Sequence, residues 1–332
     1  MPVLFSHPSS LLHETGMGHP ERVDRMHAIQ AELERRDWHG FERREAPRVT
    51  EEQLLAVHTP EHVSAVRETS ARGGAFDLDT PTSEGSWEAA LHAAGGACAL
   101  VEALLGGGER AGFSLLRPPG HHAERDRAMG FCLFANISVA ARHALDSLGA
   151  ARVLVLDWDV HHGNGTNAIF HGSSEVLFAS IHQYPFYPGT GPLSDVGSGQ
   201  GEGFSINLPV PARAGEDLFC GLVEHVVLPA ARSFDPDLVL VSAGYDAHRH
   251  DPVGGCALDT SSFAELTRQV LTLGKPVGCV LEGGYDLDAL AASVAATMEV
   301  LAGGGEPGSH PRGQFVEEAA AVVGRNWDLA RA

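Results

Sequence analysis

Short apolar runs alternate with longer amphipathic segments along most of this 332-residue chain. Five runs are rich in Val, Leu and Ile and lack a polar residue at every second position, which is typical of strands buried on both faces. They cover residues 112–116, 152–156, 176–180, 238–242 and 277–281. Helices are predicted over residues 20–36, 86–105, 134–148, 214–232, 261–273 and 287–301. This alternation predicts an α/β fold built on a parallel sheet.

A single domain is predicted over residues 1–301, because no linker and no internal repeat interrupts that stretch. Residues 303–308, Gly-Gly-Gly-Glu-Pro-Gly, have the composition of a linker. A short final helix over residues 315–330 is expected to pack back on the domain or to fray. Residues 302–332 are therefore predicted to be a C-terminal linker and helix.

The charge balance excludes some partners. The formal net charge is −20, from 23 basic and 43 acidic residues. We therefore expect neither nucleic acid nor an anionic membrane as a partner, since both are bound through Lys and Arg. A cationic substrate would be attracted, although an acidic surface also serves solubility alone.

Cysteine usage and the N-terminal residues indicate a cytoplasmic protein. The five cysteines are widely spaced and form no CxxC pair, which is typical of reduced thiols. The first residues lack the basic and apolar regions of a signal peptide. No unbroken apolar stretch approaches the ~18 residues of a membrane-spanning helix. A homo-oligomer is compatible with the sequence.

The segment from residue 153 to residue 165, VLVLDWDVHHGNG, runs from a buried strand directly into carboxylates and imidazoles. Residues two apart on a strand share a face, so Asp157, Asp159 and His161 are expected on one side. Trp158, Val160 and His162 are expected on the other. In parallel α/β sheets ligands bind beyond the carboxyl ends of the strands, where this segment lies.

Buried carboxylates need a compensating charge, and a zinc ion with oxygen and nitrogen ligands would supply it. Asp159 and His161 provide two ligands, and a third is expected from another strand end. Asp246 is the best candidate, because residues 238–246 repeat the pattern of buried strand, glycine and acid. The alternatives are an ion-paired or capping cluster for the first segment and a helix N-cap for Asp246.

Two further loops carry polar side chains after predicted strands. His121 and His122 follow a rigid Pro-Pro-Gly turn, and histidine is the side chain most easily poised near neutral pH. Tyr285 follows Glu-Gly-Gly after residue 281, and its hydroxyl could donate to a developing oxyanion. Incidental histidines and a core tyrosine are the alternatives. A metal, a base and a donor together indicate a metal-assisted hydrolase.

Six motifs in order, RPPGHHA, GFCLF, DWDVHHGNG, FYPGTG, DLVLVSAGYDAH–DP and LEGGYDL, resemble the histone deacetylase family. The similarity is closest to class II members and their bacterial relatives. It also includes residues 18–22 and 77–80 and covers residues 1–301. The resemblance implies the arginase/deacetylase fold, an α/β domain with a central parallel sheet of about eight strands flanked by helices.

The resemblance implies one zinc ion per chain, held by Asp159, His161 and Asp246. It also implies one or two structural potassium ions. The ligands of the first, partly through carbonyl oxygens, are Asp157, Asp159, His161, Ser180 and Ile181. A second would lie near Phe170, Ser173 and Val176.

The resemblance also assigns catalytic roles. His122 would be the general base for the attacking water and then the acid for the leaving amine, while His121 would stabilise charge in the transition state. Asp157 would orient His121, and Asn164 would face His122. Many class I relatives carry an acid where this chain has Asn164, a change that could alter the basicity of His122. Tyr285 matches the family's oxyanion tyrosine.

Other matched positions concern the substrate. Gly130, Phe131 and Tyr187 would line a narrow channel for a linear chain, and Ser83 would hold the substrate backbone. Tyr187 stands where relatives usually have phenylalanine, so one channel wall is expected to be more polar here.

The resemblance implies an acylated lysine peptide or a small N-acyl amine, such as an acetylated polyamine, as the substrate. Some polyamine deacetylases place a glutamate after the Asp-Pro pair that is Asp251-Pro252 here, whereas this chain has Val253. That difference favours acetyl-lysine or another short acyl-lysine. Two rivals remain: a ureohydrolase of similar fold with two manganese ions, and a non-catalytic protein that binds acyl amines. The first would need more Asp and His ligands than the spacing offers.

Overall fold

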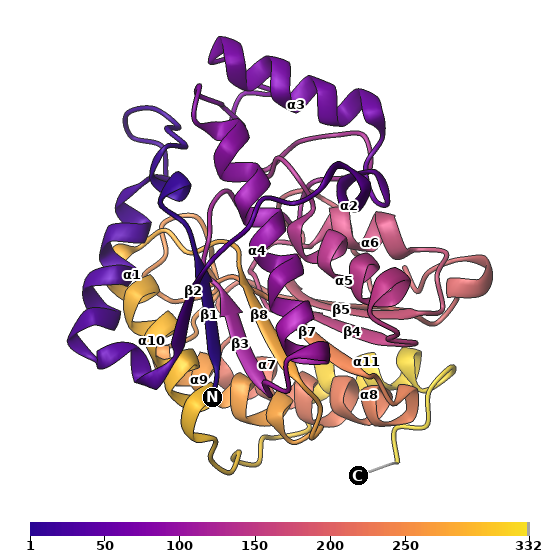
Figure 1. Ribbon diagram of the computed structural model, residues 1–332. Coiled ribbons are helices and arrows are strands. Elements are labelled where there is room, and N and C mark those ends of the chain that lie inside the picture. The colour runs from indigo at the N-terminus through magenta and orange to yellow at the C-terminus, as the bar shows by residue number, and fades with distance from the viewer. Residues whose placement is uncertain (331–332) are drawn as a thin grey trace.

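The computed structural model describes residues 1–330. A single sheet of eight strands, all parallel, forms the centre of the molecule, with helices on both faces (Figure 1). The strand order is β2-β1-β3-β8-β7-β4-β5-β6. The strands are β1 Val3–Ser6, β2 Glu42–Glu45, β3 Ala111–Ser114, β4 Val153–Asp157, β5 Val176–Gln183, β6 Ser205–Val210, β7 Leu238–Ala243 and β8 Val277–Leu281. The predicted α/β fold class is confirmed.

The five predicted strands are β3, β4, β5, β7 and β8, and each lies inside the sheet, where both faces are covered. The prediction missed β1, β2 and β6. Both edge strands are among these, and neither is a continuous apolar run. β2 reads Glu-Arg-Arg-Glu and is largely exposed, while β6 contains Asn207 and Pro209. Proline is tolerated on an edge strand, because one side of it makes no ladder bonds.

Six helices cover one face of the sheet: α1 Asp24–Arg35, α7 Glu216–Leu222, α8 Leu228–Phe234, α9 Thr260–Leu271, α10 Leu287–Gly303 and α11 Gln314–Val323. The predicted helix over residues 214–232 is α7 and α8 joined by a π-helical turn, Val223–Val227. The predicted helix over residues 20–36 begins later than expected, at Asp24.

The other face carries α4 Ser86–Gly106, α5 Asn136–Ser147 and α6 Asn164–Phe170. The one-turn helix α2 Glu51–Leu55 and the longer helix α3 Pro60–Arg72 pack beyond α4, around a smaller apolar cluster. The sequence reading missed α2, α3 and α6. Among residues 1–330, α4 alone is long and apolar enough to cross a membrane by length and composition, and 83% of the window that qualifies is buried inside the protein.

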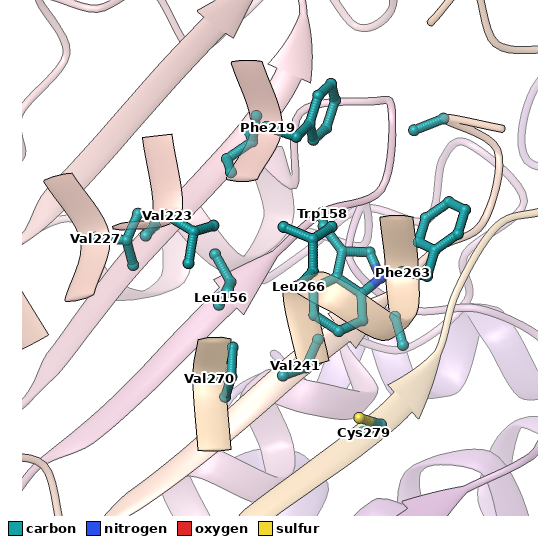
Figure 2. Packing of buried hydrophobic residues seen from close by; sticks show 14 of the residues in the cluster. Leu156, Trp158, Phe219, Val223, Val227, Val241, Phe263, Leu266, Val270 and Cys279 are labelled. Carbon is teal, nitrogen blue, oxygen red and sulfur yellow. The ribbon is translucent and has the colours of Figure 1, made fainter. Parts of the chain in front are cut away.

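The larger core forms between the sheet and the first helical layer (Figure 2). Leu156 and Trp158, at the end of β4, pack among side chains of α7, α9 and β7 that include Phe219, Phe263 and Val241. Val160 belongs to the same core, whereas Val153 and Val155 belong to the core on the opposite face. The predicted alternation of faces therefore continues past the end of β4 as far as His161, whereas His162, predicted beside Trp158 and Val160, packs against Phe178 of the opposite core. It directs Trp158 and Val160 into the core and leaves the carboxylates for the other side.

The C-terminal segment is docked on the domain. Val316, Ala319 and Val323 of α11 are buried in the larger core. The linker-like residues that precede α11 are mostly exposed.

Four neighbouring strands, in the order β3-β8-β7-β4, bring their carboxyl ends to one edge of the sheet. The loops that follow these strands carry the histidine pair, Tyr285, Asp246 and the Asp159–His161 segment respectively. Parallel register therefore gathers residues that are up to about 160 positions apart in sequence into one place.

Candidate active site

Asp159, His161 and Asp246 form one buried cluster beyond β4 and β7. Each offers one ligand atom, and the three atoms lie within 4.8 Å of one another. The Nδ1 atom of His161 lies 3.1 Å from Oδ1 of Asp159 and 3.2 Å from Oδ2 of Asp246. The structure thus brings together the three metal ligands predicted from the sequence.

Backbone amides orient both carboxylates. Asp159 accepts the N–H of Gly283 at 2.9 Å, and Asp246 accepts the N–H of Val160 at 2.8 Å. Side chains at Gly244 and Gly283 would overlap the carboxylates of Asp159 and Asp246. The glycines in these two loops therefore allow the backbone to approach the cluster.

The electrostatics of the cluster suit a bound cation. Burial, reinforced by the charge of Asp159, raises the pKa of Asp246 to about 7. Burial would also raise the pKa of Asp159, but His121 and His161 outweigh it and hold that pKa well below its usual range. For His161 burial acts to lower the pKa, yet its bonds to the two carboxylates raise it to about 10. Two buried carboxylates that share one imidazole form a donor set that a divalent cation would neutralise.

The two histidines that follow the Pro-Pro-Gly turn have different partners. His121 Nδ1 lies 3.0 Å from the carboxylate of Asp157, and His122 Nδ1 lies 2.8 Å from the amide oxygen of Asn164. The amide nitrogen of Asn164 donates to Glu124 at 2.7 Å, which points its oxygen at His122. His122 Nδ1 is therefore the protonated nitrogen, and Nε2 is left free to accept.

The pKa values of the two histidines are displaced in opposite directions. Burial acts to lower the pKa of His121, but Asp159 and Asp157 raise it well above 6.5. Burial, with the nearby charges of His121 and His161, lowers the pKa of His122 well below 6.5. One imidazole is thus held charged beside a neutral one, which is how environments separate acid and base roles.

Tyr285 is held from several sides. Its N–H donates to Asp251 at 2.6 Å, and its ring packs edge-on against Phe131 with centroids 5.7 Å apart. The Arg25 guanidinium lies 5.1 Å from the centre of the ring and donates to the carbonyl of Gly284 at 2.7 Å. Burial raises the pKa of Tyr285 well above 10, so its hydroxyl stays protonated and can donate.

A cavity of about 210 Å³ lies beside the metal cluster, the histidine pair and Tyr285. His122, His161 and Tyr285 line it together with three of the predicted channel residues, Gly130, Phe131 and Tyr187. Asp79, Phe186 and Val253 complete the lining. The Tyr187 ring stands perpendicular to that of His122, with centroids 5.1 Å apart. A larger cavity beside β1 and β2 contains none of the predicted catalytic residues.

Ser83 does not line this cavity. Its hydroxyl donates to the carbonyl of Leu12 at 3.1 Å and accepts the N–H of Glu14 at 2.9 Å, which fastens the loop before α1 to the start of α4. The geometry therefore gives no support to a role for Ser83 in holding the substrate backbone.

Asp79 occupies the wall instead. The matched motif at residues 77–80 includes Asp79 without a role, because its place in the cavity wall depends on how the loop folds and no local sequence pattern shows it.

Glu282 is a second residue without a predicted role. This fully buried carboxylate accepts the N–H of Gly120 at 2.6 Å and the N–H of His121 at 3.1 Å. It thereby links the loop of Tyr285 to the loop of the histidine pair. Burial raises its pKa to about 7. These contacts span more than 160 positions in sequence, so no local pattern could reveal them.

Together these features define a class of amide hydrolases. The class has a parallel α/β sheet whose carboxyl edge carries a buried Asp-His-Asp cluster, a histidine pair and a tyrosine. A histone deacetylase domain model matches residues 19–301. The chain belongs to the histone deacetylase family.

Three comparisons describe its relatives. Histone deacetylase 15 of Arabidopsis thaliana is 43% identical over 295 residues, which is 86% of this chain and 53% of that protein. The human polyamine deacetylase HDAC10 is 41% identical over 305 residues, 86% of this chain and 45% of that protein. This chain therefore spans about half the length of these relatives. The crystal structure of the HDA15 HD domain superposes with a TM-score of 0.93 at 40% identity, over 99% of this chain and 96% of that one.

Proposed function

We propose that this protein is a zinc-dependent deacylase that removes acetyl or another short acyl group from the amine of an acyl-lysine side chain. One observation carries the proposal. A buried cluster of three metal-competent side chains contributes His161 to a cavity that the neutral His122 and Tyr285 also line. Family membership and the likeness to a deacetylase domain support it.

Asp159, His161 and Asp246 would hold the zinc ion. Two carboxylates and one imidazole suit Zn²⁺, which takes oxygen and nitrogen ligands and keeps an open position in catalytic sites. Bound there, the ion supplies Lewis-acid polarisation of the amide carbonyl and makes water a better nucleophile.

The remaining chemistry belongs to the side chains of the cavity. His122, neutral and oriented by Asn164, accepts a proton from the attacking water through Nε2 and then returns it to the leaving amine. His121, charged and paired with Asp157, stabilises the negative charge that develops beside it. Tyr285 donates its hydroxyl proton in a hydrogen bond to the oxyanion. The amide C–N bond breaks, and the products are a carboxylate and a free amine.

The cavity wall favours a linear, largely apolar chain. Phe131 and Tyr187 present aromatic surface, and Gly130 leaves room because a side chain there would overlap the ring of His122. Methylene groups of a lysine side chain would pack between such walls.

The second candidate substrate is an acetylated polyamine, which a relative named as a polyamine deacetylase suggests. Asp79 at the cavity favours it, since a carboxylate would attract a second amine. Val253 opposes it, because this position of the wall is apolar. We therefore rank acyl-lysine first.

We also propose a structural potassium ion near Asp157, Ser180 and Ile181. Asp157 of β4 and Ser180 of β5 are register partners, and all three residues are fully buried. Hydroxyl and carbonyl oxygens of such a group are suitable ligands for a hard cation. The suggested second ion, near Phe170, Ser173 and Val176, stays a prediction.

The test compares turnover of an acetyl-lysine peptide and of N-acetylputrescine by zinc-loaded protein, with a hydroxamate as inhibitor. Faster turnover of the peptide, and none after His122→Ala, is the expected result. Activity that survives His122→Ala would show that the base is misassigned, and faster turnover of the polyamine would reverse the ranking of substrates.

A further inference from the structure

One buried carboxylate, that of Asp251, joins the loops that follow the neighbouring strands β7 and β8 (Figure 1). Backbone bonds continue the ladder between these strands as far as Tyr245, whose N–H donates to the carbonyl of Gly283 at 3.1 Å. Further along the second loop, two backbone N–H groups donate to Oδ2 of Asp251 instead. Tyr285 does so at 2.6 Å and Asp286 at the longer distance of 3.4 Å. A side chain of the first loop thus takes over where the ladder stops.

The other oxygen of Asp251 holds its own loop. Oδ1 accepts the N–H of Val253 at 2.9 Å and the N–H of Gly254 at 3.2 Å. An ionised carboxylate only accepts hydrogen bonds and has about four lone-pair sites, so the four N–H groups use its whole capacity. A side chain at Gly254 would overlap the carbonyl oxygen of Asp246, so this turn packs directly on the backbone of a predicted metal ligand.

Both segments that Asp251 holds deliver a side chain to the active-site cavity. Val253 and Tyr285 each line it, whereas Asp251 is 8% exposed and is not among the lining residues. The carboxylate therefore sets the separation between one wall of the cavity and the hydroxyl that would face the oxyanion. A carboxylate needed for stability alone has no reason to serve these two segments together.

Tyr285 depends on such a support because it follows two glycines. Gly284 has a φ angle of 116°, a conformation that favours glycine, and glycine restricts the backbone least of all residues. Arg25 bonds the carbonyl of Gly284 at 2.7 Å and lies over the ring of Tyr285. The bond to Asp251 is the one made by the N–H of Tyr285 itself. Because the hydroxyl is at the far end of the side chain, a small rotation of this backbone would displace it by a larger distance.

We infer that Asp251 is a positioning residue for the oxyanion donor. It acts through the backbone of Tyr285 and keeps the hydroxyl in place relative to Val253 and the metal cluster. This inference rests on the proposed deacylase function and adds to it a residue that lines no part of the cavity.

The test is a double-mutant cycle on the zinc-loaded full chain with an acetyl-lysine peptide as substrate. Asp251→Ala should lower kcat roughly 10- to 100-fold, the scale of misplacing a catalytic group by about 1 Å. Tyr285→Phe has no hydroxyl left to position, so the same change in that background should lower kcat by less than about threefold. All four proteins of the cycle should hold one zinc ion per chain. A role in stability alone would give equal losses in both backgrounds.

Asp237→Ala is the matched control. Oδ2 of Asp237 also accepts two backbone N–H groups, those of Ala151 at 2.7 Å and Arg152 at 3.0 Å, but at the opposite end of β7. This variant should be less stable than the wild type and should keep its kcat at a temperature where it is folded.

Asp251→Asn is the second variant, to be used if Asp251→Ala does not fold. It retains one acceptor oxygen, but its NH₂ group faces two N–H donors in either orientation. Its kcat should still fall by roughly threefold or more in the wild-type background. Wild-type kcat in this variant would overturn the inference.

The four tyrosines of the chain allow a readout that does not depend on turnover. With 3-fluorotyrosine incorporated, the ¹⁹F signal of Tyr285 is the one that disappears in Tyr285→Phe. Asp251→Ala should shift or broaden this signal, and Asp237→Ala should leave it unchanged. An unaltered signal in Asp251→Ala would contradict the positioning role.

Three kinetic results would overturn the inference while leaving the deacylase proposal intact. They are wild-type kcat in Asp251→Ala, an equal loss in the Tyr285→Phe background, and an equal loss in Asp237→Ala. A zinc-loaded wild type that turns over neither the peptide nor N-acetylputrescine would overturn the deacylase proposal. The ¹⁹F measurement would then still decide whether Asp251 positions Tyr285.

Discussion

Glu282→Ala should slow catalysis although Glu282 lines no part of the cavity. Its carboxylate is the acceptor for two buried backbone N–H groups, those of Gly120 and His121, and the same loop carries Tyr285. Leaving a buried donor unpaired costs about 1–3 kcal/mol, so the loss of the acceptor for two donors should lower the free energy of unfolding by about 2–6 kcal/mol. The histidine turn would then be free to move relative to Tyr285.

The catalytic effect follows from that movement. Misplacement of a catalytic group by about 1 Å can cost on the order of 100-fold in rate. We expect kcat of Glu282→Ala to fall roughly 10- to 100-fold, with KM and zinc content little changed. Glu282→Gln is the matched control. Its amide oxygen can still accept both N–H groups, and its NH₂ group replaces Oε1, an atom without a hydrogen-bond partner among the described residues.

The assay measures kcat and KM on an acetyl-lysine peptide at a temperature where both variants are folded, with thermal unfolding recorded alongside. Wild-type kcat in a folded but destabilised Glu282→Ala protein would refute the positioning role and leave Glu282 as a purely stabilising residue. A Glu282→Gln protein as slow as the alanine variant would also count against the reasoning, because the acceptor geometry is kept.

Three further predictions concern the oxyanion donor, the buried ion pairs and pH. Tyr285→Phe should lose about 10²- to 10³-fold in kcat, the usual effect of removing one oxyanion donor, while keeping its zinc; wild-type turnover in a zinc-loaded variant would disprove the role. Glu21 bonds Arg25 at 2.9 Å and Arg117 at 2.6 Å, and both guanidinium groups are fully buried. Glu21→Gln should lower the free energy of unfolding by about 3–5 kcal/mol, because the two arginines would lose their counter-charge. An unchanged denaturation midpoint would refute this. Burial lowers the pKa of His58 to about 3, and its Nε2 accepts the N–H of Ala135 at 2.9 Å, so the folded protein holds it neutral. Its contribution to stability is complete above pH about 6.5 and should be lost as pH falls toward 3, by up to about 1.4 kcal/mol per pH unit; His58→Gln should reduce the slope of unfolding free energy against pH in that range, and an unaltered slope would contradict the assignment.

The central part of the fold could be predicted from the sequence because its strands are buried on both faces. A strand such as β7, Leu238–Ala243, is a continuous apolar run, and such a run has few alternatives to a central parallel strand. The edge strand β2 is Glu-Arg-Arg-Glu, and nothing in its composition distinguishes it from a loop. Its place comes from pairing with β1, which is a tertiary effect.

The candidate site could be predicted where its residues follow strands directly. Asp159, His161 and Asp246 do so, and the sheet order then brings β4 and β7 together. Roles that depend on contacts distant in sequence were not visible. Glu282 accepts a hydrogen bond from a residue 162 positions away, and Arg25 donates to the carbonyl of Gly284, 259 positions away. The place of Asp79 in the cavity wall depends on the folded loop, in which Thr80 bonds Phe131.

The most direct test of the account is the metal content of the purified protein and its variants, measured by native mass spectrometry after zinc loading. We predict one zinc ion per wild-type chain, one per chain in Tyr285→Phe and in His122→Ala, and almost none in Asp246→Ala. Full zinc content in Asp246→Ala, or two tightly bound zinc ions in the wild type, would contradict the metal site on which the proposed function depends.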